Sequence, residues 1–275
     1  MPSEPRTGYI QIQGEKLFYE SIGDGLPVLL LHAGVANSRM WDPQFEAMAN
    51  SYRVLRCDLR GFGNSPYPNG PFSYHADIAG LLNAMEIKSA WIVGTSFGGR
   101  VAVDFCLGHP QLVRGLVLVS PLISGYEAQD QIRTFAKKED DLLKAGKLEE
   151  AVELNLQMWI DGPNRTPKEV SAELRSKVAE MQLQAFKMPV PENVKLERLD
   201  SPALKRLHEI NVPTLIVVGE LDVAEVLTHA DELAQGIQGA RRVIIPGVAH
   251  LVSMEKPEDF NQLVFNFIGE NEAEL

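Results

Sequence analysis

The sequence predicts an α/β protein with a mostly parallel central sheet, an N-terminal antiparallel hairpin, helices on both faces of the sheet and a helical insertion. Three observations support this fold class. Short, continuously apolar runs alternate with helical patterns along the chain, as buried parallel strands alternate with helices. The first residues instead alternate between apolar and polar. Residues 122–205 contain helical patterns without a convincing strand.

The predicted hairpin comes first along the chain. Residues 9–13 alternate between apolar and polar side chains, and residues 16–19 form a second run after Gly14. A period of two predicts strands with one buried face, and the glycine between the runs predicts a turn. We therefore expect two antiparallel strands at the start of the sheet.

Six apolar runs and three helical patterns follow the hairpin. The runs are too short for buried helices and lack alternation, which is typical of parallel strands covered on both faces. They are residues 28–31, 54–55, 90–93, 116–119, 214–218 and 243–245. Apolar residues recur at helical spacing within residues 78–85, 101–107 and 260–267.

The interval 122–205 is much longer than a crossover between parallel strands, which needs only about a dozen residues. Its apolar residues recur at helical spacing, as shown by Leu142, Leu143, Leu148, Val152 and Leu156. We predict that residues 122–205 form a helical cap over one end of the sheet. Residues 1–121 and 206–275 then form the core domain.

Composition and charge exclude several classes of partner. The net charge is −11, which repels phosphate backbones and anionic lipids, so we expect neither nucleic acid nor membrane partners. Residues 1–16 lack the apolar core of a signal peptide, and no apolar run approaches the roughly 18 residues of a membrane span. Cys57 and Cys106 lie in apolar runs and are expected to be buried, reduced thiols. These features predict a cytoplasmic protein, and they do not specify its oligomeric state.

We expect no metal and no cofactor. The sequence has no His, Cys and Asp cluster with metal-ligand spacing, and no glycine-rich phosphate loop followed by lysine. Gly61-Phe62-Gly63 lacks the third glycine of a dinucleotide-binding fingerprint.

A candidate nucleophile follows the run at residues 90–93. Gly94-Thr95-Ser96-Phe97-Gly98 has the G-x-S-x-G spacing, with an apolar strand before it and a helical pattern after it. In that context the serine occupies a sharp strand-to-helix turn, where only glycine fits two residues to either side. The turn exposes the Ser96 hydroxyl and directs the Phe97 N–H at the point where negative charge would develop.

A base and an acid follow further along the chain. A serine hydroxyl needs a base to take its proton, and an acid to orient that base. Asp222 comes just after the run at 214–218, and His250 just after the run at 243–245. Because the carboxyl ends of parallel strands meet at one edge of a sheet, we expect Ser96, Asp222 and His250 to converge. Glu220 is the alternative acid.

The remaining histidines are given structural roles. His75, His109, His208 and His229 have no strand end before them and are expected at the surface or capping helices. His32 ends the run at 28–31 and is expected to form structural hydrogen bonds.

The loop after residues 28–31 is expected to supply a second donor for an oxyanion. We assign this donor to the Gly34 N–H, with Val35 as the alternative. Together with the Phe97 N–H, it would form the oxyanion hole.

Five segments, in this order along the chain, resemble segments of the α/β-hydrolase superfamily. They are Leu30-Leu31-His32-Ala33-Gly34 with Trp41, Asp58-Leu59-Arg60-Gly61-Phe62-Gly63-Asn64-Ser65, Gly94-Thr95-Ser96-Phe97-Gly98-Gly99, Gly219-Glu220-Leu221-Asp222, and His250 with Glu255, Lys256, Pro257 and Phe260. Ala33 stands where the family usually has glycine. The serine nucleophile differs from the aspartate of dehalogenase and epoxide hydrolase relatives. The chain looks most similar to 3-oxoadipate enol-lactonases and small carboxylesterases, and Asp58 and Arg60 are interpreted as structural.

The predicted activity is hydrolysis of a small carboxylic ester or lactone through an acyl-enzyme intermediate. Val35, Trp159 and Leu251 are expected to line the substrate pocket, with Trp159 in the cap roofing it. Two alternatives stay open. The same triad could serve a C–C bond hydrolase or a cofactor-free perhydrolase, or the chain could be a ligand sensor with little turnover.

Overall fold

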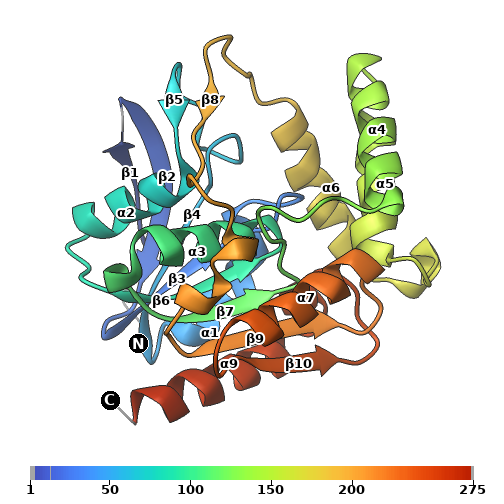
Figure 1. The fold of residues 1–275 in the computed structure, drawn as a ribbon. Helices are drawn as coiled ribbons and strands as arrows, with labels where there is room; N and C mark the ends of the chain where they lie inside the picture. Colours follow the sequence, from blue (N-terminus) through green and yellow to red (C-terminus); the bar gives the residue numbers. More distant parts are fainter. Residues whose placement is uncertain (1–3, 13, 274–275) are drawn as a thin grey trace.

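The computed structural model describes residues 4–12 and 14–273 and contains one large sheet with helices on both of its faces (Figure 1). The strand order is β1-β2-β4-β3-β6-β7-β9-β10. The strands are β1 Arg6–Ile12, β2 Glu15–Ile22, β3 Leu26–Leu31, β4 Tyr52–Cys57, β6 Ala90–Thr95, β7 Val113–Val119, β9 Thr214–Gly219 and β10 Arg241–Ile245. The pairs β1–β2 and β2–β4 are antiparallel and the other pairs are parallel. The predicted fold class is confirmed, with Gln13 of the expected hairpin outside the described residues.

The helices are more numerous than the three sequence patterns. The α-helices are α1 Asp42–Met48, α2 Tyr74–Ala84, α3 Phe97–Gly108, α4 Asp130–Lys144, α5 Leu148–Asn155, α6 Ala172–Phe186, α7 Ala224–Gly236, α8 Val252–Glu255 and α9 Pro257–Glu272. A π-helical turn, η3, spans Leu156–Asp161, and the 3-10 turns are η1 Ser38–Trp41, η2 Pro110–Leu112, η4 Pro167–Glu169, η5 Ala203–Lys205 and η6 Leu207–Glu209. None of the helices in the described residues is long and apolar enough to cross a membrane.

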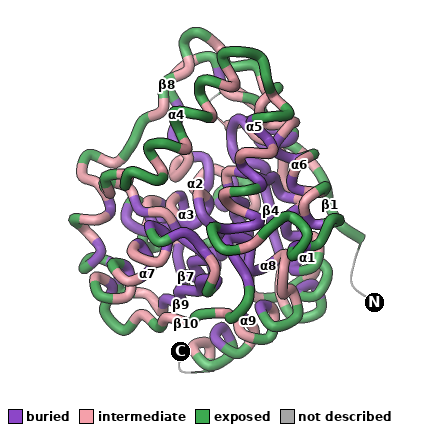
Figure 2. The backbone as a smooth tube through the Cα atoms, turned by 90° about the vertical axis from the view of Figure 1, so that its right-hand side faces the viewer, coloured by how far each residue is buried: buried purple, intermediate pink, exposed green. Residues whose placement is uncertain are grey.

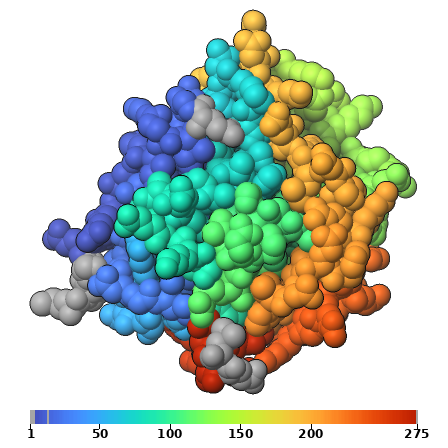
Figure 3. Space-filling view, turned by 60° about the vertical axis from the view of Figure 1, so that its left-hand side comes forward, coloured from blue at the N-terminus to red at the C-terminus, as the bar shows by residue number. Residues whose placement is uncertain are grey.

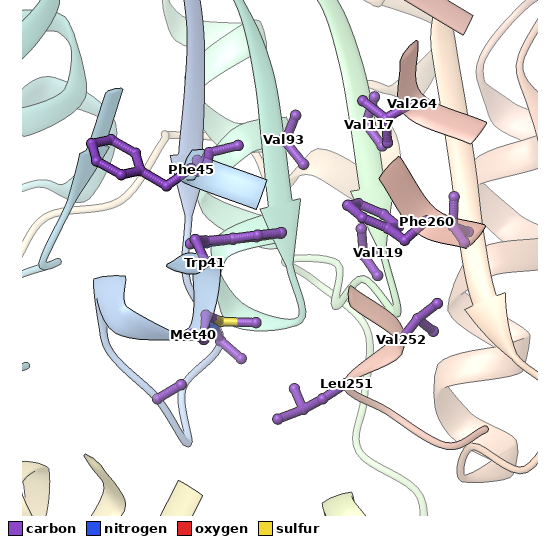
Figure 4. Packing of buried hydrophobic residues seen from close by; sticks show 14 of the residues in the cluster. Met40, Trp41, Phe45, Val93, Val117, Val119, Leu251, Val252, Phe260 and Val264 are labelled. Carbon is purple, nitrogen blue, oxygen red and sulfur yellow. The ribbon is translucent and has the colours of Figure 1, made fainter. Parts of the chain in front are cut away.

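The sheet separates two hydrophobic clusters, which explains why its strands read as unbroken apolar runs. In β3, Val28 and Leu30 belong to one cluster, whereas Leu29 and Leu31 belong to the other. The first cluster includes α1, α8 and α9, and Figure 4 shows its Trp41 and Phe260 side chains packed beside the strands. The second cluster includes α2, α3 and α7. The central strands β3, β6, β7 and β9 are therefore covered on both faces.

The interval 122–205 contains α4, α5, η3 and α6, which lie together on one side of the sheet in Figure 1. It also contains a strand that the sequence analysis did not predict. Lys195–Leu196 (β8) pairs in parallel with Pro71–Phe72 (β5), apart from the main sheet. Two residues are too few for a periodic signal, so only the pairing defines this strand.

The two ends of this interval lie side by side. Ser124 Oγ accepts a hydrogen bond from the Ala203 N–H at 2.9 Å, and the Ser124 carbonyl accepts one from the Leu204 N–H at 3.1 Å. Figure 3 shows the corresponding green and orange segments in contact on one face. The interval therefore leaves and re-enters the sheet region at neighbouring points.

Both cysteines are free and buried, as expected from their apolar surroundings. Burial raises the pKa of the Cys106 thiol to about 12. Burial also raises the pKa of Cys57, assisted by the nearby Asp58 carboxylate. Both groups are thiols rather than reactive thiolates at neutral pH.

Candidate active site

Ser96 occupies the turn between β6 and α3 in the geometry that its motif predicts. Its backbone has φ 55° and ψ −112°, a conformation that L-residues rarely adopt. A Cβ on Gly94 would overlap the Gly98 carbonyl, and a Cβ on Gly98 would overlap the Leu31 carbonyl. The two glycines therefore allow the tight turn. The Ser96 N–H holds it by donating to the Val119 carbonyl of β7 at 2.8 Å.

Asp222 and His250 meet at the ends of two adjacent strands, β9 and β10. The Nδ1 atom of His250 lies 3.0 Å from Oδ1 and 2.9 Å from Oδ2 of Asp222. Both residues are buried, and Oδ1 also accepts the Val223 N–H at 2.8 Å. Because Nδ1 faces the carboxylate, Nε2 is the ring nitrogen left for a second partner.

Ser96 and His250 line the same cavity, whose volume is about 330 Å³. Of the two contacts in the expected Ser-His-Asp row, the structure contains the one between imidazole and carboxylate. The Ser96 hydroxyl lines the cavity without a hydrogen bond to the imidazole. Such bonds are often long in ligand-free enzymes and tighten when the substrate binds.

Glu220, the alternative acid, does not approach His250 in this way. Its side chain is exposed, and Oε2 accepts the Gly247 N–H at 2.9 Å. Glu220 therefore ties the turn after β9 to the turn after β10, which explains its place near the site.

The two expected oxyanion donors lie on neighbouring loops. Gly34, Val35 and Phe97 all line the cavity with Ser96. A Cβ placed on Gly34 would lie 3.5 Å from the Phe97 Cβ, so the two loops are in contact there. Both Gly34 and Val35 stay candidates for the second donor, as in the sequence analysis.

His32 forms structural hydrogen bonds, as its position suggested. Its Nδ1 lies 2.8 Å from the Ala33 carbonyl, and its Nε2 accepts the Leu59 N–H at 2.9 Å. Burial lowers the pKa of His32, which favours the neutral ring that this pattern of donor and acceptor requires. Asp58 has a similar role, since its carboxylate accepts the N–H groups of Ser38 at 2.8 Å and Asn64 at 2.7 Å.

The four remaining histidines lie outside the cavity lining. His208 is exposed, whereas His75 and His109 are partly buried. His75 Nδ1 lies 3.3 Å from His109 Nε2. His229 was expected at the surface or as a cap, and this expectation was wrong. It is buried on the inner face of α7, and its ring centroid lies 4.2 Å from that of Tyr126. The sequence analysis did not recognise α7 as an amphipathic helix and therefore could not place His229 on its buried face.

The expected pocket residues divide between the cavity and the core. Val35 and Trp159 line the cavity, and the Trp159 ring centroid lies 4.7 Å from that of His250. Leu251 does not line it. Leu251 is fully buried in the first hydrophobic cluster, and Figure 4 shows it beside Val252 and Met40. The turn after His250 directs the Leu251 side chain into the core. Its place next to His250 in the sequence does not show this orientation.

Three polar cavity residues were missed by the sequence analysis. Glu139, Asn155 and Gln182 come from α4, α5 and α6. Each lies in an amphipathic helix whose polar residues all look alike in sequence, so no motif distinguishes those that face the cavity. Among the described residues, no group of three or more His, Cys, Asp or Glu side chains could hold a metal ion.

Comparison with known proteins decides the family. A profile of the α/β hydrolase fold matches residues 27–257. The chain belongs to the α/β-hydrolase family. The resemblance found in its five segments is therefore confirmed.

Several relatives of this α/β-hydrolase match over nearly their whole length. The putative carbamate hydrolase RutD of Azorhizobium caulinodans is 30% identical over 263 residues, which cover 92% of this chain and 95% of that protein. Carboxylesterase YbfK of Bacillus subtilis is 26% identical, covering 97% and 89% of the two chains. The solved structure of Est816, described as an N-acyl homoserine lactone degrading enzyme, has a TM-score of 0.75 at 25% identity and covers 94% of this chain and 100% of its own.

Proposed function

We propose that this α/β-hydrolase is a serine esterase or lactonase that cleaves a small carboxylic ester through an acyl-enzyme. The observation that carries this function is the convergence of three strand ends on one cavity. Ser96 and His250 line the cavity, and Asp222 holds His250 at 2.9 Å. The esterases and lactone-degrading enzymes among the relatives support the same class of bond.

In the first half of the reaction, Ser96 Oγ attacks the carbonyl carbon and its proton passes to His250 Nε2. The carbonyl π electrons move to oxygen, and the N–H groups of Phe97 and Gly34 (or Val35) stabilise that oxyanion. Each such donor is typically worth about 3 kcal/mol of barrier. When the intermediate collapses, the bond from carbon to the ester oxygen breaks, and the leaving oxygen takes the proton from Nε2. Asp222 orients the ring and stabilises its cationic form.

In the second half, water attacks the acyl carbon and His250 takes the water proton. The Ser96–acyl bond breaks, and Ser96 regains its proton from Nε2. In a lactone the leaving hydroxyl stays attached to the acyl group, so one hydroxy acid is released. The chemistry needs no metal or cofactor.

Two further features belong to this proposal. Residues 122–205 act as a cap over the core formed by residues 1–121 and 206–275, supported by the cap side chains that line the cavity. The cytoplasm is the proposed compartment, supported by the two buried free cysteines, because oxidising compartments favour disulfides.

The test is hydrolysis of short- and medium-chain p-nitrophenyl esters and of simple lactones by the wild type and by Ser96→Ala. We expect ester turnover by the wild type and a loss of at least about 10³-fold in kcat/KM in the variant. Ser120→Ala is the matched control. Ser120 also follows a strand with positive φ and is buried, but it does not line the cavity. Its kcat/KM should stay within about twofold of the wild type.

Two outcomes would contradict this function. Turnover that survives in Ser96→Ala would exclude serine nucleophilic catalysis. Clean ligand binding without turnover of any ester or lactone would favour the ligand sensor instead.

A further inference from the structure

The part of the cavity wall that comes from residues 122–205 contains three polar side chains. It contains Glu139 on α4, Asn155 on α5 and Gln182 on α6, beside the aromatic rings of Phe135 and Trp159. All three side chains line the cavity, and the helices that carry them lie together in Figure 1. We call Glu139, Asn155 and Gln182 the polar wall.

Gln182 is buried without a hydrogen-bond partner. Only 4% of its surface is exposed, and Oε1 has no partner among the residues that the structure describes. Gln184, two residues later on α6, is fully used: its Oε1 accepts from Asn37 at 3.2 Å and its Nε2 donates to the Gly63 carbonyl at 3.2 Å. One glutamine of this helix therefore binds the core, whereas the other lines the cavity with its Oε1 buried and unpaired. Buried amides are normally paired, which points to a polar ligand group.

Glu139 adds a carboxylate to the same wall. Its Oε1 accepts a hydrogen bond from Asn155 Nδ2, and Asn155 is itself buried. Burial raises the pKa of Glu139, and the bond from Asn155 opposes this shift. No lysine or arginine lies within ion-pair distance of Glu139 in the described part of the chain. A ligand donor is therefore the natural partner for its second oxygen.

The cavity lining has no cation to receive an anionic substrate. Glu139 is the one acidic side chain of this lining, which contains no lysine or arginine. A different groove, of about 930 Å³, shares no residue with the cavity. Its lining contains the basic residues Arg39, Arg56 and Lys187. A substrate carboxylate in the cavity would meet a like charge and no counter-ion.

We propose that the polar wall selects neutral esters or lactones that carry a hydrogen-bond donor, such as an amide N–H or a hydroxyl, and excludes substrates that carry a carboxylate. Glu139 accepts from that donor beside the amide of Gln182, while Asn155 holds Glu139 in place. This inference rests on the proposed hydrolysis at Ser96. It narrows the substrate class from small esters in general to donor-bearing neutral ones.

The experiment compares three p-nitrophenyl esters of nearly the same shape at pH 8. Their acyl chains end in a carboxamide (adipic acid monoamide), a methyl ketone (6-oxoheptanoic acid) and a carboxylate (adipic acid). The ketone accepts but cannot donate, so it isolates the donor. We expect kcat/KM for the amide ester to be about tenfold higher than for the ketone ester and about 100-fold higher than for the carboxylate ester. A ketone or a carboxylate ester cleaved as well as the amide ester would overturn the proposal.

Two variants assign the effect to the polar wall. Gln182→Leu should bring the amide and ketone esters to within about threefold of each other while the ketone ester keeps its rate, which also shows that the variant is folded. Glu139→Gln keeps the size and the bond from Asn155 but removes the charge, so it should raise kcat/KM for the carboxylate ester at least about tenfold. An unchanged order of the three esters in both variants would refute the role of the wall.

A control variant and the ketone ester separate this inference from the proposed function. Gln157 is an exposed glutamine of η3 outside the cavity lining, and Gln157→Leu should leave the order of the three esters unchanged. If the wild type cleaves none of the three esters, the proposed function fails. If it cleaves them all with equal efficiency, only the inference on the polar wall fails.

Discussion

The two sides of the cavity are built in different ways. On the core side, Ser96 follows β6, whose six residues are all buried, and His250 follows β10 against the buried β9. On the other side, Glu139 and Phe135 belong to α4, which has no fully buried residue. Figure 2 shows the same contrast between the purple strands and the largely green α4. The groups proposed to break the bond therefore lie beside fully buried strands, whereas Glu139, proposed to select the substrate, lies on a helix without a buried residue.

This difference teaches how the fold separates chemistry from selectivity. A change at a strand end disturbs a buried hydrogen-bond network, whereas a change on α4 alters one wall of the cavity and leaves the sheet intact. Variants on the two sides should thus differ in kind. Variants at Ser96, Asp222 and His250 should lose turnover on every substrate, and variants of the polar wall should change the order of substrates.

The largest effect expected from a further variant is at Asp222, the acid of the proposed triad. Asp222→Asn removes the charge that holds His250 and should lower kcat for all esters at least about 100-fold, because the ring loses its tautomer and its stabilising carboxylate. Steady-state kinetics on one activated ester measures this loss.

Glu220→Gln is the matched control for that variant. Glu220 follows the same strand but binds the Gly247 N–H, and a glutamine oxygen can accept the same bond. We expect kcat within about twofold of the wild type. Equal losses in the two variants would show that the loop, and not the carboxylate of Asp222, supports turnover.

The stability of the fold around His229 should be sensitive to acid. His229 is buried on α7 beside Tyr126, and Glu225 lies 3.9 Å away with Oε2 accepting the Gln129 N–H at 2.6 Å. Burial lowers the pKa of His229 to about 4 from its ordinary 6.5. Above pH 6.5 the ring is neutral in both states. As the pH falls from 6.5 to 4 only the unfolded chain binds the proton, so stability falls by about 2 kcal/mol.

Urea unfolding at pH 7.5 and pH 4.5 measures this dependence. His229→Gln should show a smaller loss of stability between the two pH values than the wild type. His208→Gln, at an exposed histidine, should behave as the wild type does. Identical pH dependence in all three proteins would exclude His229 as the source.

The smallest effect is expected at the aromatic roof of the cavity. Trp159→Ala removes the ring that lies 4.7 Å from His250 and should lower kcat/KM about fivefold, chiefly through a higher KM, because the ring contacts substrate and transition state alike. Met158→Ala is the control. Met158 precedes Trp159 and lines a different surface hollow, so this variant should change kcat/KM less than twofold. A large fall in kcat for Trp159→Ala would place the ring among the groups that support catalysis.

Most of the sheet could be predicted from the sequence, because a strand covered on both faces must be apolar along its whole length. All six apolar runs lie within strands of the main sheet. Helices α1 and α7 were not recognised, since polar residues occupy some of their buried positions and weaken the apolar period: Gln44 in α1, and Glu225 and His229 in α7. The two-residue strand β8 carries no period at all. The strand ends likewise predicted the place of Ser96, Asp222 and His250.

By itself the sequence determined the strands of the main sheet, the turn at Ser96 and the candidate groups at the ends of β6, β9 and β10. These features depend on local periodicity and on glycines whose backbone conformation is needed, and both are written in neighbouring residues. Only the tertiary structure decided that Asp222 rather than Glu220 holds His250, that Leu251 enters the core, and that Glu139, Asn155 and Gln182 share one wall. Those outcomes depend on how separate helices and turns pack against each other, and polar residues on different amphipathic helices carry no local sign of the neighbour they will face.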